Sequence, residues 1–400
     1  MSLRVVSAPW VLGGLGGKAV ADGALALDGD AVVAFGPRAG IEARHGRGER
    51  LDAVILPALV NAHLHLELSH LAGRVAGGEG LPAWIQLFLS ARASAREGEP
   101  EQAMAMAAED LVAAGVAAVG DVTNTLASLR PLASAGLAGT LYHEVFGLGP
   151  ARIEEAMAAA RAAREAAGAP PAGLRIAPSP HAVYSTHPPA VAELLRAGPA
   201  SIHLAEDPAE RELCASGTGP FARMRASLGA GPADLRPAAR SPVAAVAAHL
   251  APHHLVVHAV DVDGDDLALL ARSGATVVLC PRSNLHIGGR LPPVRRFLEA
   301  GLPLAVGTDS LASSPSLAPL AELALLRREL PDLPASRLLP LAWNGPAVGA
   351  LAVGRLAPGT APGVIAAPLG GARVEDPFEF VVSVHGAEER AFRWIARHAQ

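Results

Sequence analysis

The sequence predicts an α/β fold: a (β/α)8 TIM barrel with a small β-sandwich domain formed by the N- and C-terminal segments. Eight apolar runs of strand length recur between residues 54 and 306, and segments with helical periodicity lie between them. The repeat averages about 37 residues, which is the size of one unit of such a barrel. Polar residues follow nearly every run. This is typical of the active-site end of a barrel, because an open sheet gathers such residues at one switch point.

The expected elements follow one another along the chain. The predicted barrel strands are Val54–Val60, Val116–Val122, Gly139–Val145, Leu174–Ala177, Ala200–Leu204, Leu255–Val260, Ala275–Leu279 and Leu302–Val306. Helices are expected between them at Glu101–Ala114, Arg152–Ala167, Val243–Leu250, Gly264–Ser273 and Pro293–Ala300. Short β segments occupy both chain ends, the last at Phe380–Val384, and a final helix is expected at Glu388–Arg397. We therefore place the barrel at residues 54–348 and the β-sandwich at residues 1–53 and 349–400.

Composition excludes several classes of protein. The chain has 400 residues, of which 50% are hydrophobic, so it can build a large core and is not disordered as a whole. A net charge of −5 without a basic run offers no surface for nucleic acid or an acidic membrane. The sequence shows neither a leader pattern nor a membrane-spanning stretch, so we expect a cytoplasmic protein. Its only cysteines, Cys214 and Cys280, indicate a reducing compartment.

The basic residues are divided unevenly between lysine and arginine. Together they number 33, and Lys18 is the only lysine among them. A Schiff-base lysine, a phosphate-binding lysine or a carboxylated lysine that bridges two metals would have to be this residue, which lies in no matching motif. The 15 histidines are therefore the expected carriers of chemistry.

Four histidines and one aspartate stand at the predicted strand ends. His63 and His65 are two residues apart, so both side chains leave the same face of a strand and can reach one ion. His203, His258 and Asp309 stand at three other strand ends. Imidazoles with one carboxylate suit a divalent ion such as Zn²⁺ and leave a position for water. A His-x-His pair alone more often marks a packed strand end, so it is the convergence of all five residues that favours a metal site.

Five motifs, taken in order, resemble the signatures of the amidohydrolase superfamily. They are Pro57–His65, His203–Glu206, Val257–Ala259, Cys280–Leu285 and Gly307–Ser310, and they are most similar to its nucleobase and nucleoside deaminase branch. The resemblance extends over nearly the whole chain, including the split terminal domain. It implies one divalent ion, with Zn²⁺ favoured and iron also suited, and a further residue beside the bound water. The implied ligands are His63, His65, His203 and Asp309, and the residue beside the water is His258.

The same resemblance implies the reaction. Binuclear members of the superfamily typically join their metals through a carboxylated lysine on the fourth strand, but here this strand ends in Ser179-Pro180-His181, so one metal is expected. Glu206 stands where the deaminase branch has a proton-transferring glutamate, although taken alone it is typical of an acidic first turn of a helix. Deamination then needs a metal-activated water and a proton from Glu206 to the ring nitrogen, with Asp309 and His258 to accept the remaining proton.

Two segments after the first strand favour a particular substrate. His65–Ser69 and Leu81–Gln86 resemble segments of the aminofutalosine deaminases of menaquinone biosynthesis, except that Leu68 stands where phenylalanine is commoner. The implied substrate is 6-amino-6-deoxyfutalosine, an adenine-type nucleoside that bears a carboxyphenyl group. The residues expected to contact it are Glu67, Trp84, His181, Arg282 and His286, with Arg282, Arg92 or Arg74 as partner of the carboxylate. A structural role fits each of these residues about as well.

Other functions stay open at this point. The enzyme alternatives are deamination of another purine nucleoside, guanine or a pterin, dechlorination of a triazine, and hydrolysis of a cyclic amide. A barrel without catalysis that serves binding or assembly is the remaining alternative. The expected partner is a small-molecule nucleoside or nucleobase rather than nucleic acid or a membrane. A homo-oligomer is compatible with the sequence, which does not fix the number of subunits.

Overall fold

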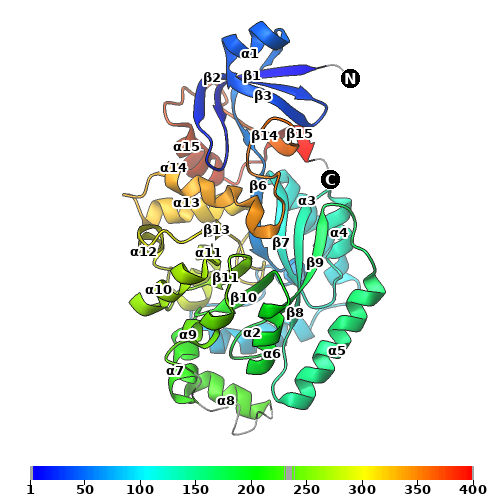
Figure 1. Cartoon of the computed structure of the whole chain (residues 1–400), viewed down its shortest axis with the longest axis vertical. Helices are drawn as coiled ribbons and strands as arrows, with labels where there is room; N and C mark the ends of the chain where they lie inside the picture. The colour runs from blue at the N-terminus through cyan, green and yellow to red at the C-terminus, as the bar shows by residue number, and fades with distance from the viewer. Residues whose placement is uncertain (1–2, 229, 231–236, 238, 399–400) are drawn as a thin grey trace.

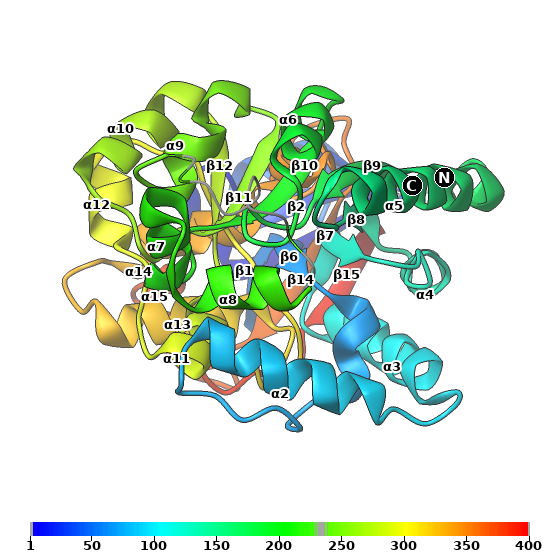
Figure 2. The same ribbon diagram turned by 90° about the horizontal axis from the view of Figure 1, so that it is seen from below.

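The computed structural model describes residues 3–228, 230, 237 and 239–398. In Figure 1 the two ends of the chain lie together in a β-sheet domain at the top, and the middle of the chain forms the larger α/β part below it. Figure 2 shows that part from the opposite end, with helices arranged around parallel strands. The predicted barrel with a separate sheet domain is therefore confirmed. Among the described residues, no helix is both long and apolar enough to cross a membrane.

Among the described residues, strands from both chain ends form one seven-stranded sheet with the order β15-β14-β5-β1-β2-β3, in which β4 pairs with β1. Side chains from both chain ends share one hydrophobic core, so the N- and C-terminal segments stabilise each other. The helix α1 (Arg38–His45) packs Ile41 against a second, smaller group of strand residues. The strands are β1 (Arg4–Leu12), β2 (Ala19–Asp28), β3 (Ala31–Pro37), β4 (Glu49–Arg50), β5 (Ala53–Pro57), β14 (Pro362–Pro368) and β15 (Arg393–His398).

The first predicted barrel strand is two strands rather than one. Its first part lies in β5, which pairs with β1 and β14 in the terminal sheet, and its second part begins β6 (Leu59–Leu64), the first strand of the barrel. Ala58 separates them, and its N–H donates to the carbonyl of Gly363 at 3.0 Å. Both strands are buried along their whole length, so hydrophobicity alone does not reveal the break. We therefore propose that the barrel begins at residue 59 rather than at residue 54.

The barrel consists of two four-stranded parallel sheets, β6-β7-β8-β9 and β10-β11-β12-β13, within the described residues. They join at two places. At the β6/β13 seam, Leu64 bridges to Asp309, and at the β9/β10 seam, His203 bridges to Ala182. The further strands are β7 (Val116–Thr123), β8 (Ala138–Val145), β9 (Leu174–Pro180), β10 (Ala200–Leu204), β11 (His254–His258), β12 (Thr276–Leu279) and β13 (Leu304–Val306). The other predicted strands coincide with these within a few residues.

Helices connect successive strands and cover the outside of the barrel (Figure 2). Side-chain caps fix the start of α7, α9 and α10, where Asp207, Ser241 and Asp263 each accept a backbone N–H group. The helices predicted between the barrel strands are present with small shifts at their ends. The helices are α2 (Leu81–Ala93), α3 (Glu99–Ala113), α4 (Leu129–Ser134), α5 (Pro150–Ala167), α6 (Pro188–Arg196), α7 (Pro208–Ser216), α8 (Gly219–Ser227), α9 (Pro242–Val246), α10 (Gly264–Ser273), α11 (Pro281–Gly288), α12 (Val294–Glu299), α13 (Pro319–Glu329) and α14 (Ala335–Leu338).

Two predicted elements near the C-terminus are wrong. Phe380–Val384 is not a strand, because α15 (Pro377–Glu379) continues into a π-helical segment, Phe380–Gly386, that packs on α13. Glu388–Arg397 is not a helix, because its second half lies in β15 and pairs with β14. Long-range contacts decide both cases. A short apolar run fits a buried helix as well as a strand, and an edge strand is stabilised by its pairing partner.

Candidate active site

The β6/β13 seam brings two imidazoles and a carboxylate together. His63 is the next-to-last residue of β6 and His65 follows the strand, so both side chains leave one face. Asp309 Oδ1 lies 3.5 Å from His65 Nε2 and 3.8 Å from His63 Nε2. The other oxygen, Oδ2, accepts hydrogen bonds from the hydroxyls of Ser283 (2.6 Å) and Ser313 (3.1 Å). The two serines therefore hold the carboxylate with one oxygen turned toward the imidazoles.

His63 is completely buried, and within the described part of the chain neither of its ring nitrogens has a hydrogen-bond partner. Burial of an unpaired polar group is unfavourable unless a ligand satisfies it. Burial lowers the pKa of His63 and lowers the pKa of His65 to about 3, so both are neutral near pH 7, which is the form that binds metal. Burial acts to raise the pKa of Asp309, but His63 and the neighbouring imidazoles outweigh this effect. The pKa therefore lies well below its usual range, and the side chain of Asp309 is an ionised carboxylate.

The β9/β10 seam gathers a second set of polar side chains. His203, on β10, places Nε2 3.6 Å from Oε1 of Glu144, the next-to-last residue of β8. His181 follows β9, and its ring centre lies 5.1 Å from that of His203. The backbone N–H of His203 donates to the backbone carbonyl of His181 at 2.9 Å, which fixes the relative position of the two residues. Because the ring centres of His203 and His63 are only 4.9 Å apart, the two seams form one cluster.

Glu144 is the negative group of the β9/β10 seam. Burial acts to raise the pKa of Glu144, but His181 and His203 outweigh it, and the pKa lies well below its usual range. Burial lowers the pKa of His181 to about 4. Burial also acts to lower the pKa of His203, but Glu144 outweighs it and the pKa is raised. The imidazole cluster therefore has a carboxylate in each seam, Asp309 in one and Glu144 in the other.

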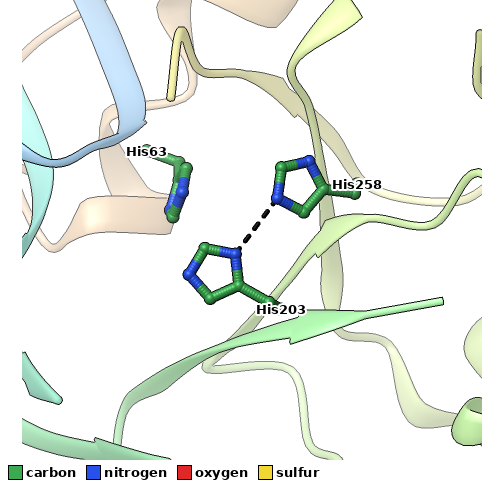
Figure 3. A group of neighbouring side chains, drawn as sticks. All are labelled: His63, His203 and His258. Atoms are coloured by element: carbon green, nitrogen blue, oxygen red, sulfur yellow. Dashed lines mark hydrogen bonds between the residues drawn. The ribbon is translucent and has the colours of Figure 1, made fainter. Parts of the chain in front are cut away.

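His258 joins the cluster to a third carboxyl group, that of Glu206. His258 Nε2 lies 3.1 Å from His203 Nδ1, the contact drawn in Figure 3, and 3.4 Å from Glu206 Oε2. On the other side of the ring, His258 Nδ1 lies 3.0 Å from Nδ2 of Asn284. An amide N–H that donates to Nδ1 leaves the ring proton on Nε2. Asn284 is therefore placed to set the tautomer of His258.

Backbone strain is concentrated at these strand ends. Ala205, His258, Ala259 and Asp309 have φ values of +55°, +75°, +48° and +59°. This left-handed region costs a non-glycine residue roughly 1–2 kcal/mol. Such strain persists where the surrounding structure requires it, and it is common at functional sites. Here it occurs at His258 and Asp309 themselves and directly before Glu206.

Glu206 lines a cavity of about 260 Å³ at the end of the barrel. Its side chain is 7% exposed, and Oε1 has no hydrogen-bond partner among the described residues. Burial, followed by repulsion from Asp309, raises the pKa of Glu206 well above its usual range, so this carboxyl group keeps its proton near neutral pH. A buried acid that faces a cavity beside imidazoles is suited to proton transfer.

Glu67, which we predicted as a substrate contact, holds a loop in this structure. Its carboxylate accepts N–H groups of Asn124 (2.9 Å), Thr125 (3.1 Å) and Ala127 (3.2 Å), which follow β7. It also accepts the hydroxyls of Thr123 and Thr125. Both oxygens are therefore engaged within the protein. The His-x-His-x-Glu spacing does not show this, because Glu67 lies in a 3₁₀ turn after the strand and not on the strand itself.

Two other predicted contact residues are engaged away from the cluster. His286 Nε2 lies 2.9 Å from the carbonyl oxygen of Val75, so this histidine fixes the loop before α2. Arg282 donates to Ser316 Oγ at 3.0 Å and pairs with Glu389 at 3.1 Å. These contacts give both residues structural roles, and we remove them from the set proposed to bind substrate.

Trp84 and Arg74 make contacts with side chains other than the clustered imidazoles. Trp84 stacks on Phe88 and belongs to an apolar cluster formed by loops that follow several barrel strands. Arg74 pairs with Glu99, and Arg92 lies in the last turn of α2. Trp84 therefore contributes to the apolar cover of the barrel end. Of the predicted contact residues, His181 is the one that reaches the cluster.

Four residues beside the cluster were missing from the predicted site. Glu144 could have been found, since it is a polar residue at the end of a predicted strand. Ser283 and Asn284 lie within a motif that was matched as a whole without a role for each residue. Ser313 lies in a loop that has no recognisable pattern, and only the three-dimensional structure places it beside Asp309.

The cluster fits a divalent metal ion. His63 forms one group with His65 and Asp309 and another with His203 and His258, and in each the donor atoms lie within 4.8 Å of one another. Imidazole nitrogens with one carboxylate are donors that zinc and iron both accept. The buried nitrogens of His63 and Nε2 of His203, which lack hydrogen-bond partners in the described residues, are the atoms that such an ion would satisfy.

The parallel barrel with a histidine and aspartate cluster at its strand ends defines a class, the (β/α)8 barrels with a candidate metal centre. The particular family follows from comparison with known proteins. Residues 54–369 match the Amidohydrolase family, and the chain belongs to that family. This match confirms the resemblance that the five sequence motifs carry.

Two relatives and one solved structure are similar over most of their length. Aminodeoxyfutalosine deaminase of Deinococcus radiodurans is 33% identical over 364 residues, which cover 86% of this chain and 84% of the relative. A 5-methylthioadenosine/S-adenosylhomocysteine deaminase of Nitratidesulfovibrio vulgaris is 31% identical over 366 residues, 85% of this chain and 78% of the relative. The structure of Helicobacter pylori aminofutalosine deaminase in complex with methylthio-coformycin has a TM-score of 0.84 at 20% identity and covers 98% of this chain and 97% of that one. This last likeness confirms the fold.

Proposed function

We propose that this protein is a metal-dependent deaminase of adenine-type nucleosides and that its substrate is 6-amino-6-deoxyfutalosine. The position of Glu206 carries the proposal, because a buried carboxyl group faces a cavity next to His258 and the imidazole cluster. Removal of an amino group from an aromatic amidine needs an acid for the ring nitrogen and an activated water that reaches the neighbouring carbon. Glu206 supplies the acid, and the cluster supplies the site that activates water.

The proposed ligands of one divalent ion are His63, His65, His203 and Asp309. Zn²⁺ is the favoured ion because neutral imidazoles with one carboxylate suit it, and iron is the alternative. When bound, the ion lowers the pKa of water toward about 7 and so supplies a nucleophile at neutral pH. Ser283 and Ser313 keep the second oxygen of Asp309 occupied, so its first oxygen faces the imidazoles.

We assign the proton transfers to Glu206 and Asp309, with His258 beside them. Glu206 donates its proton to the ring nitrogen beside the amino-bearing carbon, which makes this carbon electrophilic. Asp309 Oδ1 accepts the proton that water loses as it adds to the carbon, and His258, whose Nε2 carries the ring proton, donates a hydrogen bond to the added oxygen. Glu206, now a carboxylate 3.4 Å from His258, takes the remaining hydroxyl proton and passes it to the amine, so that the carbonyl forms and ammonia leaves. The proton held by Asp309 then restores Glu206.

The specific substrate is supported by the sequence and the relatives rather than by the geometry of the site. The more similar of the two relatives, at 33% against 31% identity, is named for aminodeoxyfutalosine. The other is named for 5-methylthioadenosine and S-adenosylhomocysteine, which gives the second candidate function. These compounds share the adenine ring and differ in the substituent on the sugar.

The test of the substrate is ammonia release by the metal-loaded protein from a panel of nucleosides, with metal analysis of the same sample. The panel consists of 6-amino-6-deoxyfutalosine, 5-methylthioadenosine, S-adenosylhomocysteine, adenosine and guanine. We expect the first compound to have the highest kcat/KM and the metal content to be near one ion per chain. A higher kcat/KM for another adenine nucleoside would change the assigned substrate but leave the assigned reaction, deamination, in place. The absence of ammonia with every compound would overturn the proposal.

Glu206→Gln tests the residue that carries the proposal. Glutamine keeps the size of the side chain but cannot pass a proton between ring nitrogen and amine, so kcat should fall about 10²- to 10⁴-fold. The metal content should stay within about twofold, because Glu206 is not a proposed ligand. Glu212→Gln, an exposed position on α7, is the matched control and should leave kcat unchanged. If Glu206→Gln kept more than about a tenth of the activity, the assigned role would be wrong.

A further inference from the structure

Two neighbouring cavities open at the same end of the barrel. The first, of about 260 Å³, is lined by Glu206 and Arg290, and the second, of about 580 Å³, is lined by Arg223 of α8. Asp207 lines both. Sites for small molecules usually measure roughly 300–1,000 Å³, so the first cavity is too small to enclose a whole nucleoside with a large substituent. A substrate that reaches Glu206 must therefore extend to the mouth of this cavity.

Arg290 lies at the mouth of this cavity, and its guanidinium has N–H groups that are not used in hydrogen bonds among the described residues. Its side chain is 52% exposed, whereas that of Glu206 is 7% exposed and lies at the inner end. In the described part of the chain its ion-pair partner is Asp261 at 3.7 Å, which is beyond hydrogen-bond distance. Asp261 is already held by Arg211, whose Nε lies 2.7 Å from Oδ2 and whose Nη2 donates to the Asp261 carbonyl at 2.8 Å. The planar donor fork of Arg290 is therefore available to a ligand.

The acidic residue shared by the two cavities does not neutralise Arg290. Asp207 Oδ1 accepts the N–H of Ala209 at 2.8 Å, and Oδ2 accepts the N–H of Leu81 at 3.0 Å. Each oxygen thus lies at the first turn of a helix, α7 or α2, where the positive end of the helix dipole offsets its charge. Residual repulsion from Asp207 and Asp261 disfavours a doubly charged phosphate more than a singly charged carboxylate.

We propose that Arg290 binds a carboxylate on the sugar-side substituent of the substrate and so selects carboxylate-bearing adenine nucleosides over neutral ones. This inference rests on the proposed function, which places the purine ring against Glu206 at the inner end of the cavity. The sugar and its substituent then point to the mouth, where an arginine fork and a carboxylate form two charge-assisted hydrogen bonds. Arg282 and Arg74, which we considered from the sequence, are each paired with a glutamate of the protein.

The test measures binding rather than turnover. The metal-loaded Glu206→Gln protein is titrated in a calorimeter with three compounds. This variant is used because it should not deaminate the compounds during the titration. Of these, 6-amino-6-deoxyfutalosine and S-adenosylhomocysteine carry a carboxylate and 5-methylthioadenosine does not. Adding Arg290→Gln should weaken binding of 6-amino-6-deoxyfutalosine about ten- to a hundredfold, with a smaller loss for S-adenosylhomocysteine, which also carries an ammonium group. Binding of 5-methylthioadenosine should change less than about twofold, because its complex lacks the ion pair.

Two further variants complete the set. Arg290→Lys should recover part of the lost affinity, because lysine keeps the charge without the fork. Arg223→Gln, at the exposed arginine of the adjoining cavity, is the matched control and should change the affinity for each ligand less than about twofold. The inference is overturned by equal losses for charged and neutral ligands, by no loss, or by a selective loss in Arg223→Gln instead.

Ammonia release by the unmutated protein separates this inference from the proposed function. If no nucleoside is deaminated but the carboxylate ligands still bind through Arg290, the proposed function fails and the role of Arg290 stands. If deamination occurs and Arg290→Gln affects all ligands alike, the function stands and the role of Arg290 fails. If no nucleoside is deaminated and none of the three ligands binds, both are overturned.

Discussion

The two seams of the barrel carry similar side chains, but they assemble and hold them in different ways. At the β6/β13 seam both imidazoles come from one strand end, and the second oxygen of Asp309 is held by two serine hydroxyls. At the β9/β10 seam Glu144, His181 and His203 come from three consecutive strands. There the second oxygen of Glu144, Oε2, accepts a hydrogen bond from Nδ2 of Asn124 at 3.0 Å. Both groups have donor atoms within 4.8 Å of one another, which is compatible with a metal ion.

The difference bears on which carboxylate would be a metal ligand. Asp309 faces two imidazoles from one strand end, and Nε2 of His63 lacks a hydrogen-bond partner in the described part of the chain. Glu144 faces His203, which the other seam also uses, and carboxylates that contact ligating histidines commonly orient them. We therefore infer that the ion lies at the β6/β13 seam, with His203 as its ligand from the other seam, and that Glu144 positions His203. The following substitutions test this division in order of decreasing effect on turnover.

Asp309→Asn should have the largest effect. Asparagine has a similar size but lacks the negative charge that the cluster needs for a divalent ion, so metal content should fall below about a tenth of that of the unmutated protein. Because the same carboxylate is proposed to accept a proton, kcat/KM should fall on the order of 10⁴-fold. Metal analysis and ammonia release measure the two effects. Asp265→Asn, an 82% exposed aspartate on α10, is the control and should alter neither quantity.

Glu144→Gln should have an intermediate effect. If Glu144 orients His203 without binding the ion, metal content stays within about twofold while kcat/KM falls roughly 10- to 100-fold. Metal analysis should give about one ion per chain in both proteins. Two ions per chain in the unmutated protein and one in Glu144→Gln would show instead that the β9/β10 seam holds a second metal, and the comparison between the seams would then fail.

The same contrast explains how much of the site the sequence could predict. The β6/β13 seam contains His63 and His65 at strand spacing and Asp309 within a recognisable motif, so all three could be assigned to strand ends, and a closed barrel makes the first and last strands neighbours. On β8, no histidine or carboxylate stands two residues from Glu144, and its meeting with His203 depends on how β9 and β10 join. Strand-end position indicates such residues as candidates, but only the closed barrel shows which of them meet.

The fold follows the same rule. Barrel strands and their helices are predictable because buried parallel strands and amphipathic helices leave different periodicities in the sequence. The sequence pattern does not predict the elements whose structure depends on a long-range contact. At Ala58 one apolar run is divided between two sheets, and at Arg393–His398 pairing with β14 makes the segment a strand. The contacts of Arg282 and His286 could not be predicted for a related reason, since their partners Glu389 and Val75 lie far away in the chain.

Glu67→Gln should have the smallest effect on turnover and a larger one on stability. Its carboxylate accepts hydrogen bonds from the loop of residues 123–127 and lies outside the two seams. Glutamine replaces one acceptor oxygen with a donor NH₂ group, which leaves buried N–H or hydroxyl groups of the loop unpaired. The free energy of unfolding should therefore fall by about 1–3 kcal/mol. Urea unfolding of the metal-loaded proteins measures it.

Activity distinguishes a loop-holding role from the substrate contact that the sequence suggested for Glu67. If the carboxylate only holds the loop, the folded variant keeps kcat/KM within about threefold, and metal content does not change. Gln86→Glu, on the exposed side of α2 in the neighbouring loop region, is a control for surface charge at this end of the barrel and should change neither stability nor kcat/KM appreciably. A Glu67→Gln protein of unchanged stability whose KM rises more than tenfold would return Glu67 to the substrate site, because only a direct contact weakens binding without loosening the loop.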